Sequence, residues 1–151
     1  MNVRSWITFI VTVLMLSACG DNAKEEAQKL LMEARTYFEQ GNLEAARKDI
    51  DSLRNTYPND VEARKGALRL HQDIELKAAQ IEMAHTDSLL QMANQELEAL
   101  QAQVEEHKKA LKATPEELTL LTRTRMKRDS IRTQFDTLGM KIRYIHQKQK
   151  E

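Results

Sequence analysis

The sequence predicts an all-α protein with two short helices, one long helix and a returning helix. Glu, Lys, Leu, Ala and Gln, which favour helices, are abundant, whereas the 151 residues include only four Gly and two Pro. β-branched and aromatic residues are sparse after Trp6, so strands are not expected. Apolar residues recur at spacings of three and four, which is the period of one face of a helix.

The chain begins with an apolar tract, from Trp6 to Leu16, behind an N-terminus whose only charged side chain is Arg4. The tract is too short for a typical transmembrane helix and has the length of a secretory signal core. It ends in Leu16-Ser17-Ala18-Cys19, which resembles the lipobox of bacterial lipoproteins. The resemblance implies removal of residues 1–18 as a signal peptide, and a diacylglycerol and an N-acyl lipid on Cys19.

A lipidated Cys19 would make the protein exported and membrane-anchored. Enteric lipoproteins that are retained in the inner membrane carry Asp directly after the lipidated cysteine, whereas this chain has Gly20 there. The resemblance therefore favours the outer membrane, and it leaves open whether the protein faces the periplasm or the cell surface. A plain secretory signal followed by a chance cysteine is the alternative. Cys19 is the sole cysteine, so no internal disulfide is expected.

Charge excludes one class of partner. Without residues 1–18 the chain has 22 Lys and Arg against 23 Asp and Glu. Nucleic-acid binders carry a basic surplus, so no nucleic acid is expected.

Two short antiparallel helices are predicted within residues 19–60. The face of the first comprises Ala27, Leu30, Leu31, Ala34, Tyr37 and Phe38, and that of the second comprises Leu43, Ala46, Ile50, Leu53 and Tyr57. Gly41 can close the first helix, Asn42 can cap the second, and Pro58 ends it.

These residues resemble a single tetratricopeptide repeat. Its spacing is matched by Ala34, Tyr37, Gly41, Ala46 and Pro58, with Leu30, Ile50 and Leu53 at other packing positions. Residues 34–58 also resemble the first repeat of the outer-membrane β-barrel assembly lipoprotein family. The resemblance implies a helix pair with these side chains as its core. A second repeat would need Gly near Glu75 and Ala near Gln80, and both are absent.

A long helix is predicted over residues 61–113, interrupted only by Gly66. Its start offers Ala63, Ala67, Leu70 and Ile74 as a face that could cover the helix pair. A heptad seam follows, formed by Met83, Leu90, Leu97, Val104 and Leu111 with Thr86, Ala93, Leu100 and His107. Thr86, Asp87 and Ser88 could instead cap a new helix, so a break between His85 and Ser88 stays open.

The last helix, within residues 114–151, is predicted from the capping box Thr114-Pro115-Glu116-Glu117. Its matching seam comprises Leu121, Thr124, Arg128, Ile131, Phe135, Leu138, Ile142 and Ile145. A hairpin would place Leu111 opposite Leu121, Val104 opposite Arg128, Leu97 opposite Phe135 and Leu90 opposite Ile142. The polar layer of Val104, His107, Thr124 and Arg128 would then fray or receive a partner.

The two arms of this hairpin are oppositely charged. Residues 78–107 contain six acids and no Lys or Arg, whereas residues 123–150 contain nine bases and two acids. The arms should therefore pair, and charge should select the orientation more than it stabilises. The same pairing between molecules through residues 78–145 would give a homo-oligomer.

No catalytic set is predicted. The glycines are scattered, and His71 with Glu75 or His85 with Asp87 supply too few ligands for a metal. We expect no enzyme activity, metal or cofactor, and a helical scaffold or protein-interaction module that binds envelope proteins. The alternatives are an accessory subunit of outer-membrane protein assembly, and a binder of an anionic envelope polymer or lipid through Arg125, Arg128 and Arg132.

Overall fold

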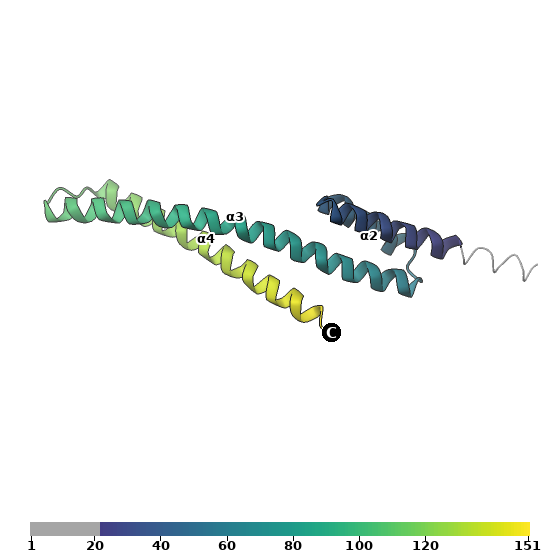
Figure 1. The fold of residues 1–151 in the computed structure, drawn as a ribbon. Coiled ribbons are helices and arrows are strands. Elements are labelled where there is room, and N and C mark those ends of the chain that lie inside the picture. Colours follow the sequence, from purple (N-terminus) through teal and green to yellow (C-terminus); the bar gives the residue numbers. More distant parts are fainter. Residues whose placement is uncertain (1–21) are drawn as a thin grey trace, which may run out of the picture. The chain divides into compact units, whose positions relative to one another are not determined.

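The computed structural model describes residues 22–151, which form four helices and no strand (Figure 1). The first covers residues 22–39, and it is followed by α2 (Leu43–Thr56), α3 (Val61–Lys109) and α4 (Pro115–Lys148). The predicted all-α class is confirmed. The described chain divides into an N-terminal unit, residues 22–75, and a C-terminal unit, residues 76–151, and α3 contributes to both.

In the N-terminal unit a tight turn joins the first helix to α2. Gly41 has a φ of 78°, a conformation that glycine adopts without a steric penalty. The amides of Gly41 and Asn42 donate to the carbonyls of Phe38 and Tyr37 at 3.0 and 2.8 Å, which is the Schellman arrangement for ending a helix. The Asn42 side chain then accepts from the Ala45 amide at 3.1 Å and caps α2.

The first turns of α3 complete a three-helix core. A second cap starts α3, because Asp60 Oδ1 accepts from the Ala63 amide at 2.9 Å. A Cβ on Gly66 would lie 2.5 Å from Leu31 Cδ2, so the lack of a side chain there allows α3 to approach the first helix closely. The buried cluster comprises Ala27, Leu31, Ala34, Ala46, Ile50, Leu53, Ala63, Ala67, Leu70 and Ile74. The predicted cover of the helix pair by α3 is therefore present.

In the C-terminal unit α4 runs back along the second half of α3 (Figure 1). The α3 helix is continuous through residues 85–88. Ser88 Oγ donates to the Ala84 carbonyl at 3.2 Å, and Asp87 Oδ2 accepts from Gln91 Nε2 at 2.8 Å. These side chains bond along the helix, and the alternative of a break here is not adopted.

The long helix ends at Lys109, four residues earlier than expected. Leu111, predicted as a seam residue, is 94% exposed and has a φ of 55°. Its amide donates to the Lys108 carbonyl at 3.0 Å, and the Lys112 amide donates to the His107 carbonyl at 2.8 Å. Leu111 therefore occupies the left-handed position of a Schellman turn, where glycine is usual. The prediction that Leu111 packs opposite Leu121 is wrong.

The predicted register of the two arms is also wrong, by at least one heptad. His107 contacts Glu117, Glu96 contacts Lys127, and a Cβ on Gly139 would lie 3.9 Å from Met83 Cε. These contacts place Val104 near the level of Leu121 and Leu97 near that of Arg128. Farther from the tip, the bond between Gln134 and Glu82 shows a larger offset. The shift follows from the turn, which occupies residues that the predicted register required to be helical.

Candidate interaction surfaces

The lipobox, Cys19 included, lies outside the described residues. Lipidation therefore stays a prediction from sequence, and the candidate sites on the described chain are surfaces of its helices.

The residues of the repeat-like pair lie mostly where the spacing predicts. Ala34, Ala46, Ile50 and Leu53 are buried, Leu30 is partly buried, and Gly41 forms the turn. Pro58 lies in the turn between α2 and α3 and lines a hollow there.

Tyr37 is the exception within the repeat-like pair, because its side chain is 38% exposed. Phe38, the next residue, packs partly against the core instead. The assignment of Tyr37 to the core is therefore wrong, and the resemblance to a tetratricopeptide repeat stays a prediction.

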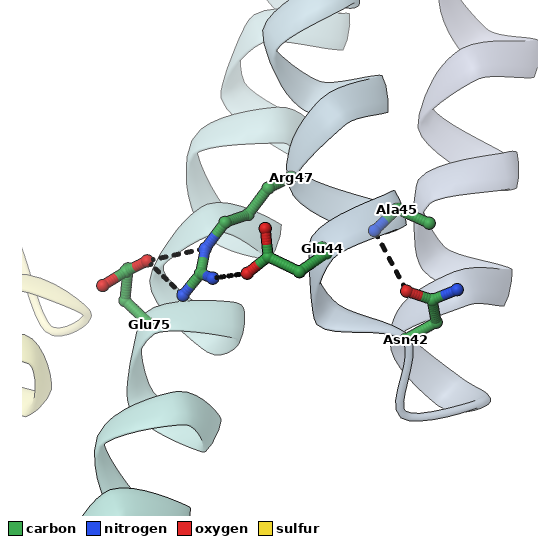
Figure 2. A network of polar contacts seen from close by, with 5 residues as sticks. All are labelled: Asn42, Glu44, Ala45, Arg47 and Glu75. Atoms are coloured by element: carbon green, nitrogen blue, oxygen red, sulfur yellow. Dashed lines mark hydrogen bonds and ion pairs between the residues drawn. The ribbon is translucent and has the colours of Figure 1, made fainter.

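Arg47 ties α2 to α3 through acidic partners (Figure 2). Its Nη2 lies 2.8 Å from Glu75 Oε1, and its Nη1 lies 2.6 Å from Glu44 Oε1. Burial opposes the charge of the guanidinium, but Glu75 and then Glu44 outweigh it and raise the pKa of Arg47. Side chains of Arg47 and Glu75 are 29% and 25% exposed, so this pair is screened less than one on the open surface.

Asp49, on α2, is a partly buried acid whose surroundings disfavour its negative charge. Its Oδ2 is buried and has no hydrogen-bond partner. Burial, and then the negative charge of Glu33 on the first helix, raise the pKa of the Asp49 carboxyl, while Lys48 acts in the opposite direction. Asp49 therefore opposes packing of the first two helices when it is ionised.

Two hollows lie at one end of the N-terminal unit. The first, about 290 Å³, is bounded by Ala23 and Lys24 at the start of the first helix and by residues 56–60. The second, about 250 Å³, is lined by three bases and two exposed apolar side chains: Arg54, Val61, Arg64, Lys65 and Leu68. We call these five residues the basic-apolar hollow.

The basic-apolar hollow was not predicted from the sequence. A signal was available, because Val61 and Leu68 are apolar residues out of phase with the buried face that Ala63, Ala67 and Leu70 form. An apolar residue outside the core stripe of a helix is a candidate contact for a partner.

In the C-terminal unit the seam residues on both arms turn towards each other. On α3, Leu97 is buried and Leu90 and Leu100 are partly buried; on α4, Leu138 is buried and Leu121, Ile131, Phe135 and Ile142 are partly buried. Lys127 Nζ lies 3.1 Å from Glu96 Oε2, and Gln134 Nε2 donates to Glu82 Oε1 at 3.3 Å. The acidic and basic arms thus meet within one chain.

Hydrogen bonds join the two helices at the tip, so the fraying expected for the polar layer is not seen. Glu117 Oε2 accepts from the Thr114 amide at 3.0 Å, completing the predicted capping box. Glu117 Oε1 lies 2.7 Å from His107 Nδ1 on α3. The Thr114 amide, and then His107, lower the pKa of the Glu117 carboxyl against the opposing effect of burial. Val104 and Thr124 are buried, and the register shift moves Arg128 away from their layer.

The three bases proposed from sequence as an anionic-partner surface are not equivalent. Arg125 and Arg132 are exposed. The Arg128 side chain is only 24% exposed. Its Nε lies 2.8 Å from Asp129 Oδ1 on the same helix, without the geometry of a hydrogen bond. Arg128 is therefore mostly covered, and the two exposed bases are the better candidates for an external anion.

One outward stripe on α4 is comparatively apolar. Met126, Met140 and Tyr144 are 67%, 55% and 60% exposed. Between them, Thr133 and Thr137 donate their hydroxyls to the carbonyls of Asp129 and Thr133, at 3.0 and 2.8 Å. We call these five residues the outer stripe.

Residues 22–151 contain no group of three or more His, Cys, Asp or Glu placed to hold a metal ion. In the same part of the chain, no helix is both long enough and apolar enough to cross a membrane.

No family model, no curated protein and no solved structure matches the chain.

Proposed function

We propose that the protein is a noncatalytic lipoprotein of the bacterial envelope, anchored through Cys19, whose helices bind other envelope proteins. The observation that carries the proposal is the apolar tract from Trp6 to Leu16 that runs directly into Leu16-Ser17-Ala18-Cys19. Its length is that of a secretory signal, and its cysteine is the one nucleophilic thiol in the sequence.

The outer stripe is the surface best suited to a protein partner. Met side chains adapt to irregular surfaces, and Tyr is enriched among residues that dominate binding energy. The Thr hydroxyls within the stripe already bond to the α4 backbone, so covering them costs less than covering unpaired hydroxyls would.

Lipidation is tested first. Cells expressing the full chain are fed an alkyne-bearing fatty acid, and the N-terminal peptide is analysed by mass spectrometry. Label on residue 19 and its loss in Cys19→Ala are expected. An unmodified thiol on a processed chain would refute the anchor.

Partner binding is tested on the lipidated protein by crosslinking in the native envelope and mass spectrometry. Met126→Glu should abolish recovery of a defined partner. Met92→Glu is the matched control, because Met92 is 65% exposed on α3 and Met126 is 67% exposed on α4. Equal loss in both variants, or recovery of self-adducts alone, would contradict partner binding through the outer stripe.

A further inference from the structure

The start of the first helix and the turn between α2 and α3 lie at the same end of the N-terminal unit. Ala23 and residues 56–60 bound one hollow, and Tyr57 Oη donates to Glu26 Oε2 at 2.6 Å. The turn at Gly41 lies at the opposite end, because the first helix is roughly 27 Å long at about 1.5 Å per residue. The unit therefore has an end close to its N-terminus and an end remote from it.

The length of chain before the described residues limits how far Cys19 lies from this end. Four residue steps separate Cys19 from Ala23, and they span at most about 14 Å. A lipid on Cys19 would hold Ala23 within that distance of the membrane interface. The turn over residues 57–60 would also lie near the membrane interface. The Gly41 turn, at the opposite end of the unit, could lie away from it.

The basic-apolar hollow occupies this same end. Arg54 lies in the last turn of α2, and Val61, Arg64 and Lys65 lie in the first turns of α3. Val61 and Leu68 are 60% and 50% exposed. Arg64 Nη1 donates to the Pro58 carbonyl at 3.0 Å, which fixes its stem beside the turn and leaves its other nitrogens as donors. Lys65 Nζ lies 3.0 Å from Glu62 Oε1 in an exposed pair, so a lipid phosphate would compete with that carboxylate for the ammonium group.

We infer that the basic-apolar hollow binds the phosphate headgroups of anionic lipids in the membrane that holds Cys19. Guanidinium and ammonium groups bind phosphate, and exposed apolar side chains beside them can enter the interfacial region. The inference rests on the proposed lipidation. It adds that the N-terminal unit lies on the membrane with one defined end.

The test uses the lipidated full-length chain in vesicles of phosphatidylethanolamine and phosphatidylglycerol. Lipidation consumes the only native thiol, so an introduced cysteine can be labelled alone with a fluorophore. Asn59→Cys places the probe in the α2–α3 turn, and Gln40→Cys places it by the Gly41 turn; both positions are exposed. A headgroup-linked quencher should quench the probe at residue 59 and not the probe at residue 40.

Charge variants test the headgroup contact itself. Arg54→Gln with Lys65→Gln should lower the ratio of bound to detached orientations, by about fivefold for Arg54 and by less for Lys65, whose charge Glu62 partly offsets. Quenching at residue 59 should fall with this ratio. Arg35→Gln with Lys48→Gln removes two exposed bases elsewhere in the unit and should leave quenching unchanged.

Equal quenching at residues 59 and 40 would overturn the inference. So would quenching at residue 59 that is unchanged by Arg54→Gln with Lys65→Gln. Mass spectrometry of the same samples separates its failure from that of the proposed function. A protein that lacks the lipid refutes the anchor, whereas a lipidated protein without this quenching pattern refutes only the membrane contact of the hollow.

Discussion

The two units bury their helices differently. In the N-terminal unit three helices enclose large aliphatic side chains, and Ile50, Leu53 and Ile74 have no exposed surface. In the C-terminal unit two helices meet along one seam, where the largest fully buried side chains are Val104 and Thr86. A third helix therefore concentrates burial in a few large residues. Two helices spread burial along their length, and polar pairs at the edge help to fix which residues meet.

Ile50→Ala should have the largest effect and tests this comparison directly. It removes a fully buried side chain, so the free energy of unfolding of the N-terminal unit should fall by about 2–5 kcal/mol. Leu97→Ala, in the two-helix seam, should cost less because neighbouring side chains can close around the gap. Urea unfolding, with hydrogen exchange assigned to each unit, measures both. A larger loss for Leu97→Ala would contradict the comparison.

Leu111→Gly tests the register of the C-terminal unit. The left-handed conformation of Leu111 is unfavourable for a residue with a Cβ and natural for glycine at the end of a helix. The variant should unfold with an unchanged or higher free energy, by up to about 1 kcal/mol. If Leu111 packed opposite Leu121, as the heptads alone suggest, the same substitution would instead cost about 2 kcal/mol or more.

The sequence predicted which faces of the helices are buried better than it predicted how they align. Ala63, Ala67, Leu70 and Ile74 follow the pattern of threes and fours that is typical of a helix with one buried face. The heptad pattern is unchanged by a slide of seven residues, so Leu111 could be placed in the seam without contradiction. The alignment depends on the turn, whose backbone path the spacing of apolar residues does not encode.

The spacing of apolar residues also did not predict which side chains at the edge of a helix face are covered. Tyr37 and Phe38 both lie near the apolar face of the first helix, and only Phe38 packs against the three-helix core. Arg47 illustrates the same limit, because its partner Glu75 is 28 residues away and no local spacing links them. The basic-apolar hollow likewise comes from two helices and the turn that joins them.

Asp49→Asn should stabilise the N-terminal unit at neutral pH. The folded-state pKa of Asp49 is raised above its ordinary 3.8, so ionisation is harder in the folded chain. Its cost is present above the folded pKa and disappears as the pH falls towards and below 3.8. Urea unfolding at pH 7 and pH 3 should show the gain at pH 7 alone. A gain of equal size at both values would show that charge is not its source.

Glu117→Gln should reveal the opposite response to acid in the C-terminal unit. The folded-state pKa of Glu117 is lowered below its ordinary 4.5. Its stabilisation is therefore complete above 4.5 and is lost as the pH falls through the folded value. Gln can still accept from the Thr114 amide, so the variant should keep its cap and lose this pH dependence. Unfolding of wild type and variant between pH 6 and pH 3, with exchange assigned to α4, provides the measurement. If the unfolding free energies of wild type and variant changed with pH in parallel, Glu117 would not be the source of the pH dependence.

The smallest effect should come from the ion pair between Lys127 and Glu96. Both side chains are more than half exposed, so a double-mutant cycle with Lys127→Ala and Glu96→Ala should give a coupling of about 0.2–1 kcal/mol. Salt should reduce it further. A coupling near zero with the register intact would mean that the seam alone aligns the arms. The reversed pair, Lys127→Glu with Glu96→Lys, is the second test. A coupling of similar size in the reversed pair would show a preference for opposite charges at these two positions, whereas no coupling in either orientation would leave the turn and the apolar layers as the source of alignment.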